Sequence, residues 1–573
     1  MKLKVFILSF LFSASMSFAQ TKTNDTIQDQ VVNVIKPYSP TVADAFKVKE
    51  IPKLNDSSTA PKRQVKYTIF SIPVASTFTP AKGKAAGVEK QKRPKQYNNY
   101  ASLGLGTYST FLGEVYLSHE LDNDQSIGAY LGHHTSLGEI DGVLLDNDFS
   151  NTDLHVDFTQ NARDLLWKVY AGYDLSSYNW YGLTPELYSM QEIETIDPGH
   201  TFNGLMVGGQ LEFFDGIFEE ASINFRRFTD SYGSGENYFF SDFDFEVPIG
   251  NHSLENSLRF DYLNGSFDRD YASNNPLEYG FLTTGLESSY VVTENDLTVN
   301  IGLRLVYLNN TENSENKFYI YPNIEASYRL VSDVVIGYGG ITGDLLQNTY
   351  GDFANDNPFI SPTLLIAPTD QQYNFFIGMR GKLSNEVGYN IKGAYSSEDN
   401  KALYRLNPAL ISDQQNYQFG NSFGLVYDEV NTLMIEGALN VDFSRNFTMG
   451  LKGAFFSYNT SQQEEAWNLP GVTASLFADY QITEHWYTGL SSFFTGERKD
   501  QLLIEGSLSD ELQVTKELNS FFDVNVYGGY RINDQFSMFV KVNNLLNQEY
   551  QRWINFPVQG IQFLAGASYQ FDF

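Results

Sequence analysis

Histidine is the first residue type to test for chemistry in this sequence of 573 residues, because it serves both as a metal ligand and as a general base. No two of its histidines have the i, i+2 or i, i+4 spacing that places two rings on one face of a strand or helix. His133 and His134 are adjacent, so a strand would point them to opposite faces. The spacing predicts structural histidines, at positions 119, 133, 134, 155, 200, 252 and 485.

One G-x-S-x-G string, Gly420-Asn421-Ser422-Phe423-Gly424, has the spacing of a hydrolase nucleophile elbow. That elbow needs a sharp turn from a strand into a helix. The string instead lies inside a strand-like stretch with no helical periodicity after it. We interpret it as a chance match and keep a hydrolase only as a distant hypothesis. We expect the protein not to be an enzyme.

Acidic loops are the remaining candidates for chemistry, because carboxylate oxygens suit Ca²⁺. None of them has the complete spacing of an EF-hand loop, so solvated loop charges are the preferred interpretation. Cysteine is absent, which excludes disulfides and thiolate metal sites. We predict no metal and no cofactor. The acidic clusters are Asp146-Asn147-Asp148, Asp268-Arg269-Asp270 and Asp352-Phe353-Ala354-Asn355-Asp356.

The N-terminus is typical of a secretion signal. Lys2 and Lys4 precede an apolar stretch, and Ser17-Phe18-Ala19 is a small-x-small cleavage site. We predict a signal peptide over residues 1–19, with cleavage between Ala19 and Gln20. No later stretch contains 18 consecutive apolar residues, which excludes a helical integral membrane protein.

Charge divides the rest of the chain in two. Residues 20–96 hold 14 basic residues against six acids, whereas residues 97–573 hold 22 against 63, within a net charge of −31. Such an acidic body argues against a nucleic-acid partner. We expect 20–96, with its seven Pro, to be a periplasmic or lumenal segment. The basic residues that would contact a lumen or a partner are Lys82, Lys84, Lys90, Lys92, Arg93 and Lys95.

The acidic body alternates with the period of two that strands require. From Ile561 to Phe573, apolar and aromatic residues occupy every odd position and mostly polar or small residues the even ones. Leu297 to Tyr307 repeats the pattern. We find 23 candidate strands, among them 417–428 and 431–443. Because bacterial barrels use even numbers, we predict an all-β, transmembrane, antiparallel up-and-down barrel of about 22 strands over 97–573, with 20 to 24 tolerable.

Connection lengths support a barrel rather than a soluble sandwich or propeller. Tight turns such as Gly250-Asn251 alternate with long gaps such as 180–200 and 343–370, as in outer-membrane barrels. Tyrosines toward strand ends would then form the interfacial girdles of a barrel. These tyrosines are Tyr116, Tyr170, Tyr173, Tyr307, Tyr328, Tyr480 and Tyr530.

The C-terminal region resembles the barrel of TonB-dependent receptors. The resemblance is carried by Val540 to Tyr550, with Asn543, Asn544, Leu545 and Tyr550, and by the strand from Gly560 to Phe573. The loop Asn357 to Pro362, leading into Tyr373-Asn374-Phe375, is similar to a receptor outer loop. The resemblance implies a 22-strand outer-membrane barrel, with Tyr569, Phe571 and Phe573 as the signal for the barrel-assembly machinery.

The sequence departs from that family before the barrel. Residues 20–96 are too few for a full plug domain, and Asp25 to Val34 resemble a TonB box only faintly. We therefore expect an integral outer-membrane channel, or the membrane component of a transport assembly, in contact with outer-membrane lipid and lipopolysaccharide. The alternative is a non-transporting docking barrel whose segment 20–96 recruits a periplasmic or outer-membrane partner.

Overall fold

The computed structural model describes residues 97–184, 187–250, 252–410, 414–505 and 511–573. The predicted signal segment, its cleavage position and the basic residues between Lys82 and Lys95 lie outside the described residues. Their assignments stay predictions.

Nearly all secondary structure is strand. The first barrel strands are β1 (Asn99–Gly106), β2 (Phe111–Asp122), β3 (Gln125–Ser136), β4 (Phe149–Asn161), β5 (Leu165–Asn179), β6 (Gly199–Phe213), β7 (Phe218–Asp230), β8 (Gly235–Ile249), β9 (His252–Phe267), β10 (Leu277–Glu294) and β11 (Leu297–Asn310). The others are β12 (Glu315–Val331), β13 (Val335–Leu346), β14 (Thr369–Ser384), β15 (Val387–Leu406), β16 (Phe423–Ser444), β17 (Phe447–Thr460), β18 (Val472–Gln481), β19 (Trp486–Thr495), β22 (Phe521–Arg531), β23 (Phe536–Asn543) and β26 (Gln562–Phe571).

Small elements lie in the connections between these strands. Two hairpins are formed by β20 (Arg498–Glu505) with β21 (Glu511–Leu518) and by β24 (Gln551–Trp553) with β25 (Phe556–Pro557). The helices are α2 (Met190–Ile193) and α3 (Tyr350–Asp356). Among the described residues, no helix has the length and apolar character needed to cross a membrane.

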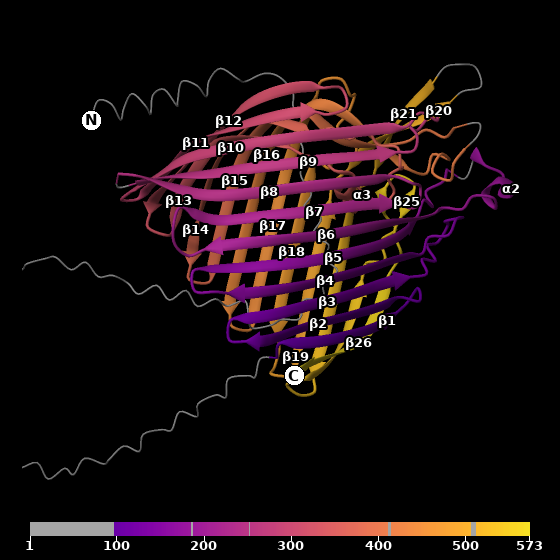
Figure 1. Ribbon diagram of the computed structural model, residues 1–573. Coiled ribbons are helices and arrows are strands. Elements are labelled where there is room, and N and C mark those ends of the chain that lie inside the picture. The colour runs from indigo at the N-terminus through magenta and orange to yellow at the C-terminus, as the bar shows by residue number, and fades with distance from the viewer. Residues whose placement is uncertain (1–96, 185–186, 251, 411–413, 506–510) are drawn as a thin grey trace, which may run out of the picture. The chain divides into compact units, whose positions relative to one another are not determined.

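The strands form one antiparallel 22-stranded sheet that closes on itself (Figure 1). The closing pair is β1 with β26, in register from Asn99 opposite Phe571 to Gly106 opposite Leu564. Within hydrocarbon every backbone N–H and C=O needs a partner in the protein, and closure removes the two free edges. The predicted 22-strand up-and-down barrel is confirmed.

One strand was divided wrongly in the sequence interpretation. Residues 417–428 and 431–443 were expected as two strands, but β16 runs unbroken from Phe423 to Ser444. It has 22 residues, whereas a membrane-spanning strand needs about 9–11, so its first half extends beyond the bilayer and tolerates acids. Asp428 there is buried and accepts hydrogen bonds from the backbone of Gln462 and Gln463 at 2.9 and 2.7 Å.

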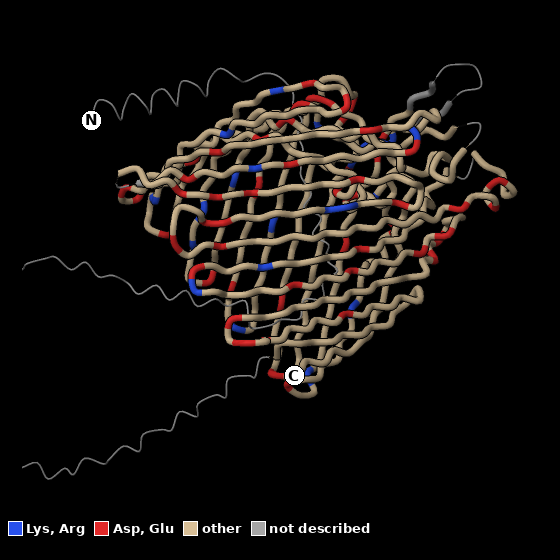
Figure 2. Tube along the Cα trace, viewed as in Figure 1, with Lys and Arg blue, Asp and Glu red and all other residues tan. Residues whose placement is uncertain are grey.

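The two rims of the barrel differ, as the connection lengths predicted. Turns of two to four residues join the strands at the rim that carries both barrel termini, which we call the inner rim. The longest connections, with α2, α3 and both hairpins, gather at the opposite rim, the outer rim (Figure 1). Acidic residues occur on both rims and along the wall (Figure 2).

Alternation separates a lipid-facing from a lumen-facing surface. On β11, Ile301 and Leu303 expose 56% and 45% of their surface on the outside, while Asn300 and Arg304 point inward. Five of the seven tyrosines predicted for the girdles face outward. Tyr173 and Tyr307 lie near the outer rim, and Tyr328, Tyr480 and Tyr530 lie near the inner rim.

Two of the predicted girdle tyrosines point into the lumen instead. Tyr170 donates to Asn224 on the lumen side, and Tyr116 stacks on Tyr100 with ring centroids 6.0 Å apart. Tyr170 follows the exposed, lipid-facing Val169, and Tyr116 lies two residues from the buried Glu114, on the same face of β2. Because successive side chains alternate, position near a strand end does not decide the face.

The assigned faces predict opposite outcomes for two neighbouring residues. Ile324→Arg, on the lipid side of β12, should lower the free energy of unfolding by about 2–4 kcal/mol, the cost of an Arg near the bilayer midplane. Urea unfolding in phospholipid vesicles, followed by tryptophan fluorescence, measures this. Glu325→Arg is the matched control, because Glu325 faces the lumen and should tolerate the change. Equal destabilisation by both variants would contradict the assignment.

Candidate functional site

Four outer connections meet over the lumen. We call their described parts the lid: residues 180–198 after β5, 347–368 after β13, 407–422 after β15 and 544–561 after β23. Nine strands separate β5 from β15 on the shorter way round the ring. Contacts between these connections therefore cross the outer mouth of the barrel.

Trp180 is the point at which three lid connections join. Its side chain is 1% exposed and its indole Nε1 donates to the carbonyl of Ile360 at 3.2 Å. The carbonyl of Trp180 accepts from Asn421 at 2.8 Å. The indole also stacks on the ring of His200, at 4.0 Å between centroids. A buried indole with its N–H satisfied both fills volume and fixes orientation.

The fourth connection, 544–561, packs face to face against the second. Phe359 stacks on Phe556 with centroids 4.0 Å apart, and Tyr181 donates to the carbonyl of Pro557 at 2.9 Å. A Cβ at position 182 would lie 2.2 Å from the Phe556 ring, so Gly182 permits this close approach. The lid is thus packed like a protein core.

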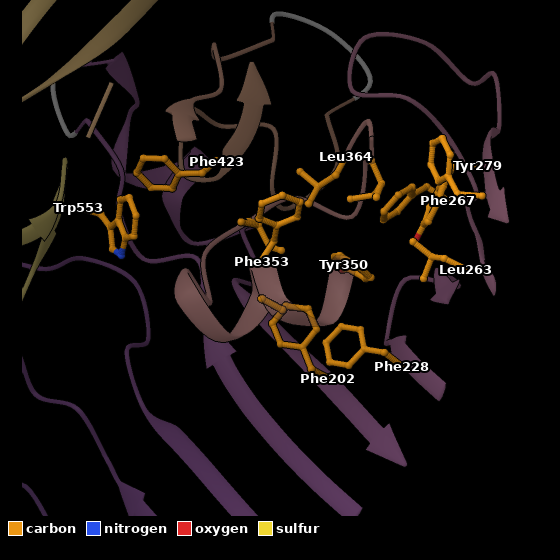
Figure 3. Packing of buried hydrophobic residues seen from close by; sticks show 14 of the residues in the cluster. Phe202, Phe228, Leu263, Phe267, Tyr279, Tyr350, Phe353, Leu364, Phe423 and Trp553 are labelled. Carbon is orange, nitrogen blue, oxygen red and sulfur yellow. The ribbon is translucent and has the colours of Figure 1, made fainter. Parts of the chain in front are cut away.

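The residues of these contacts belong to, or pack against, the largest hydrophobic cluster among the described residues. Figure 3 shows Tyr350 and Phe353 of α3 facing Phe202 and Phe228 of the barrel wall. The cluster continues through the other lid connections and the outer ends of the strands. Its members include Leu263, Phe267, Tyr279, Ile360, Leu364, Ile366, Leu406, Phe423, Trp553, Ile554 and Phe556.

A polar latch holds α3 to the wall. Glu236 of β8 is 1% exposed and accepts from the backbone N–H of Tyr350 at 2.6 Å and from the hydroxyl of Tyr279 at 2.8 Å. Arg226 of β7 donates to Asp352 at 2.7 Å and to Thr349 at 2.5 Å. Because burial of unpaired charges is costly, these partners make the seated position of α3 strongly preferred.

The start of α3 follows from its sequence. Thr349 is the N-cap, and its side-chain oxygen accepts from the backbone N–H of Asp352. Asp352 places a negative charge in the first turn, where the helix dipole favours it. Burial and the neighbouring Asp230 carboxylate raise the pKa of Tyr350 well above its usual value. Its hydroxyl therefore stays protonated and donates to Asp230 at 2.7 Å.

Asp500 ties the β20–β21 hairpin to the end of β15 and to the connection after β17, and Arg498 ties it to the lid. It is 0% exposed and accepts from the backbone N–H of Leu406 at 3.1 Å and from Asn468 at 2.8 Å. Arg498 of the same strand donates to the carbonyl of Gln551 in the 544–561 connection at 2.8 Å. Burial raises the pKa of Asp500 to about 6.

The lumen wall below the lid carries separated charges. Lumen-facing acids concentrate on β4 to β10, including Asp153, Asp157, Asp174, Asp242, Asp244 and Glu287. Lumen-facing bases concentrate on β14 to β17, including Arg380, Lys382, Lys392 and Lys452. Arg304 of β11 and Arg259 of β9 meet Asp344 of β13 at 2.5 and 3.8 Å. Charged walls of this kind influence which ions a pore admits.

The receptor-like motif forms the start of the 544–561 connection. Asn544, with φ of 46°, bonds through its side chain to the carbonyls of Gln548 and Gln559 at 3.0 and 3.1 Å. Tyr550 stacks on Phe521 at 4.0 Å. A Cβ at Gly560 would lie 2.7 Å from a side-chain oxygen in the same connection. Asn543 donates to Gln562 of β26, and Leu545 is 43% exposed.

The terminal aromatics lie on the outside of β26. Tyr569 and Phe573 are 44% and 77% exposed, and Phe571 lies between them with centroids 5.7 and 5.6 Å away. They form an aromatic row at the inner rim. Recognition of this row by the assembly machinery remains a prediction.

Ser422 is a structural residue of the lid. It is 0% exposed, donates to the carbonyl of Tyr417 at 2.6 Å and accepts from Asn407 at 3.0 Å. The G-x-S-x-G string ends in β16 rather than lying wholly within a strand, because β16 begins at Phe423. With no basic side chain among these contacts, the geometry is not that of an activated nucleophile.

The remaining candidates for chemistry are dispersed. Among the residues that the structure describes, no group of three or more His, Asp or Glu could hold a metal ion. Asp270 accepts a hydrogen bond from the backbone N–H of Ser273 in its own turn, and Asp352 belongs to the latch. His134 faces the lumen and His133 the outside, as adjacency predicted.

Sequence reasoning missed Trp180 of the lid and the wall residues Arg226 and Glu236 that hold α3. One signal was present: three of the five tryptophans, at 180, 467 and 553, fall in long connections rather than within barrel strands. Tryptophans of a girdle belong at the interfaces, so Trp in a long loop indicates a buried anchor.

Removing the latch arginine should loosen α3. Arg226→Ala leaves the half-exposed Asp352 and the buried Glu236 without their cation, and leaving a buried charge without its partner costs up to about 3–5 kcal/mol. We expect chymotrypsin to cut the folded protein after Tyr350 or Phe353 at least roughly tenfold faster, measured by mass spectrometry. Arg329→Ala, at the exposed inner end of β12, is the control and should leave the rate unchanged. An unchanged rate in Arg226→Ala would contradict the latch.

Asp500 predicts a pH dependence of the seating of the β20–β21 hairpin. Its pKa rises from 3.8 to about 6 on folding because burial penalises the carboxylate, so the folded state binds more protons between pH 4 and 6. The free energy of an opening that exposes both Asp500 and the Leu406 amide to water therefore falls as pH rises through that window and is constant above it. Hydrogen exchange of the Leu406 amide, corrected for intrinsic rates, should show stronger protection at pH 4 than at pH 7. Asp500→Asn should remove the difference; a rise in protection with pH would refute the assignment.

Comparison with known proteins supports the fold. No protein-family model and no curated protein matches the sequence. Among solved structures, the ferripyoverdine receptor of the outer membrane of Pseudomonas aeruginosa is 13% identical with a TM-score of 0.59, covering 84% of this chain and 72% of that chain.

Two transporters align equally well. The FrpB iron transporter from Neisseria meningitidis has 10% identity and a TM-score of 0.63 over 83% of this chain and 82% of that chain. The copper transporter OprC has 11% identity and a TM-score of 0.58 over 84% and 82%. At these identities the likeness is one of fold: the chain has the 22-strand outer-membrane barrel of TonB-dependent receptors.

Proposed function

We propose that this protein is the membrane component of a transport assembly, with its outer mouth held shut by its own loops. The observation that carries the proposal is the lid, in which connections from opposite sides of the ring share a core. Transport is supported by the solved structures of similar fold, among which are an import receptor for ferric catecholates, an iron transporter and a copper transporter. Passage of a solute then requires displacement of the lid.

The charged lumen supports a transport role over a purely structural one. A ring of 22 strands is too wide for wall side chains to fill, so the lumen-facing side chains below the lid border an interior space. Here the interior carries many charges, and some of them pair between adjacent strands, as Lys452 of β17 does with Glu436 of β16 at 3.0 Å. Such walls act on ions that enter.

The competing function is a docking barrel that passes no solute. The tight packing of Trp180 and the Phe359–Phe556 stack favours it, because a permanently closed mouth conducts nothing. In that case segment 20–96 would recruit the partner, as the sequence suggests. Conductance distinguishes the two functions.

One connection of the lid, residues 347–368, can be cut out without disturbing the sheet. Leu346 and Thr369 face each other as the last pair of β13 and β14. Residues 347–368 can therefore be replaced by Asn-Gly, which forms the tight turn that two adjacent antiparallel strands need. We expect low single-channel conductance for the full chain in planar bilayers and at least a tenfold increase for this variant.

A matched control uses the connection between β3 and β4. Ser136 and Phe149 are likewise a terminal pair, so residues 137–148 can be replaced by the same turn. This connection touches the lid from the side, because Gly138 accepts from Gln559 at 2.6 Å and Leu145 packs against Leu183. Its removal leaves the Trp180 and Phe359–Phe556 contacts in place and should leave conductance unchanged. A full chain that already conducts as strongly as the lid variant would refute the closed mouth, and a lid variant that conducts nothing would favour docking. Deleting residues 20–96 in the same recordings tests whether that segment obstructs flow.

A further inference from the structure

The outside of the barrel carries a polar hollow that the proposed function does not use. It measures about 460 Å³ and lies on β7 to β10 near the outer rim. We call it the outer-wall hollow; its lining includes Arg227, Thr229, Gly235, Asn237, Tyr262, Asn264, Ser266, Glu278 and Glu312. The strand residues among these alternate with lumen-facing ones, so they belong to the outer surface.

The register arranges these residues in rows across four strands. The lowest row is Phe225, Phe239, Tyr262 and Leu282, the last apolar row of the lipid-facing surface. Directly above it is Arg227, Asn237, Asn264 and Gly280, and above that Thr229, Gly235, Ser266 and Glu278. The hollow therefore stands on the boundary of the lipid belt, at the level of lipid headgroups.

Two glycines and one connection shape the hollow. Gly235 and Gly280 leave gaps in rows otherwise filled by side chains. A Cβ at Gly280 would lie 2.0 Å from Thr311 Oγ1 and 2.8 Å from Glu312 Oε1, so the connection 311–314 leans over the sheet and forms one side. Pockets of about 300–1,000 Å³ hold small molecules.

The polar groups are ordered before any ligand arrives. Arg227 donates to Asn237 at 2.7 Å, and Asn237 donates to Asn264 at 3.4 Å. Asp230 at the edge accepts from the backbone N–H groups of Tyr232 and Ser234 at 2.8 and 2.9 Å, which fixes the turn after β7. Pre-ordered side chains lose less entropy on binding.

The chemistry of this lining suits a saccharide. Amides of Asn237 and Asn264 both donate and accept, Glu278 accepts, and Arg227 donates, as sugar hydroxyl groups require. The exposed ring of Tyr262 offers an apolar face for the C–H groups of a pyranose. Phosphate fits poorly, because one Arg stands among three acids, Asp230, Glu278 and Glu312.

From this geometry we infer that the outer-wall hollow binds a saccharide carried by a glycolipid of the outer leaflet. Its position just above Phe225 and Tyr262 puts the hollow beside the sugars that such a lipid presents at the membrane surface. A free oligosaccharide shares the chemistry but lacks the anchoring acyl chains. The two sources are separable by measurement.

The test uses the full chain in phospholipid nanodiscs and isothermal titration calorimetry. The probes are the core oligosaccharide of a rough-type lipopolysaccharide, released by mild acid and dephosphorylated, and the intact lipopolysaccharide incorporated in the nanodiscs. We expect both to bind, the intact lipid more tightly. Asn237→Leu/Asn264→Leu, which fills the hollow with apolar groups, should weaken both at least tenfold.

The matched control is another cross-strand asparagine pair on the outer surface. Asn431 and Asn459 face each other on β16 and β17, so Asn431→Leu/Asn459→Leu makes the same change away from the hollow and should leave binding intact. Heat-modifiable migration on denaturing gels verifies that each variant is folded. Failure of the dephosphorylated oligosaccharide to bind, or equal affinity of the hollow and control variants, would overturn the inference. Tighter binding of the free oligosaccharide than of the intact lipid would overturn the glycolipid source.

Discussion

The structure depends on one constraint, that no backbone hydrogen-bonding group of a membrane-spanning sheet can be left unpaired in hydrocarbon. The pairing of β1 with β26 meets it, because eight residues of each strand remove the only two edges that the sheet would have. Closure then dictates the rest. Every strand has one face toward lipid and one toward the lumen, and every connection must lie at one of two rims.

A ring of 22 strands creates a second problem, since it is too wide for wall side chains to fill. In this protein the described outer loops contact one another across the mouth and share an aromatic core. Trp180, Phe359 and Phe556 make contacts across the ring that resemble those inside a soluble domain. The lid therefore draws its stability from hydrophobic burial, which the lipid-facing wall cannot use. Polar groups of the wall, such as Glu236, then fix the position of α3 and of the lid core against the barrel.

Local patterns made the barrel predictable and left the lid unpredictable. The alternation from Ile561 to Phe573 is a property of neighbouring residues, so a single sequence reveals it. The contact of Trp180 with Ile360 joins residues 180 positions apart, and no periodicity indicates such a pair. The misdivided strand β16 has the same origin: Asp428 breaks the local pattern, and its partners Gln462 and Gln463 lie beyond the next turn. The direction of Tyr116 and Tyr170 was missed because register, not position, decides the face.

Strands β7 and β8 show how the pleat gives one pair of strands two tasks. Arg226 and Glu236 turn inward to the latch, while the next residue on each strand, Arg227 or Asn237, turns outward to the hollow. A slip of one residue in either strand would exchange the two sets, placing the latch charges beside lipid. The latch and the outer-wall hollow therefore require the same register, and so does the lipid-facing row below the hollow, which contains Phe225 and Phe239.

The lid and the outer wall also share one turn. The hydroxyl of Tyr350 in the lid donates a hydrogen bond to Asp230 at the edge of the hollow. A ligand that orders this turn from outside would stabilise the seated lid, since binding energy that depends on one conformation favours that conformation.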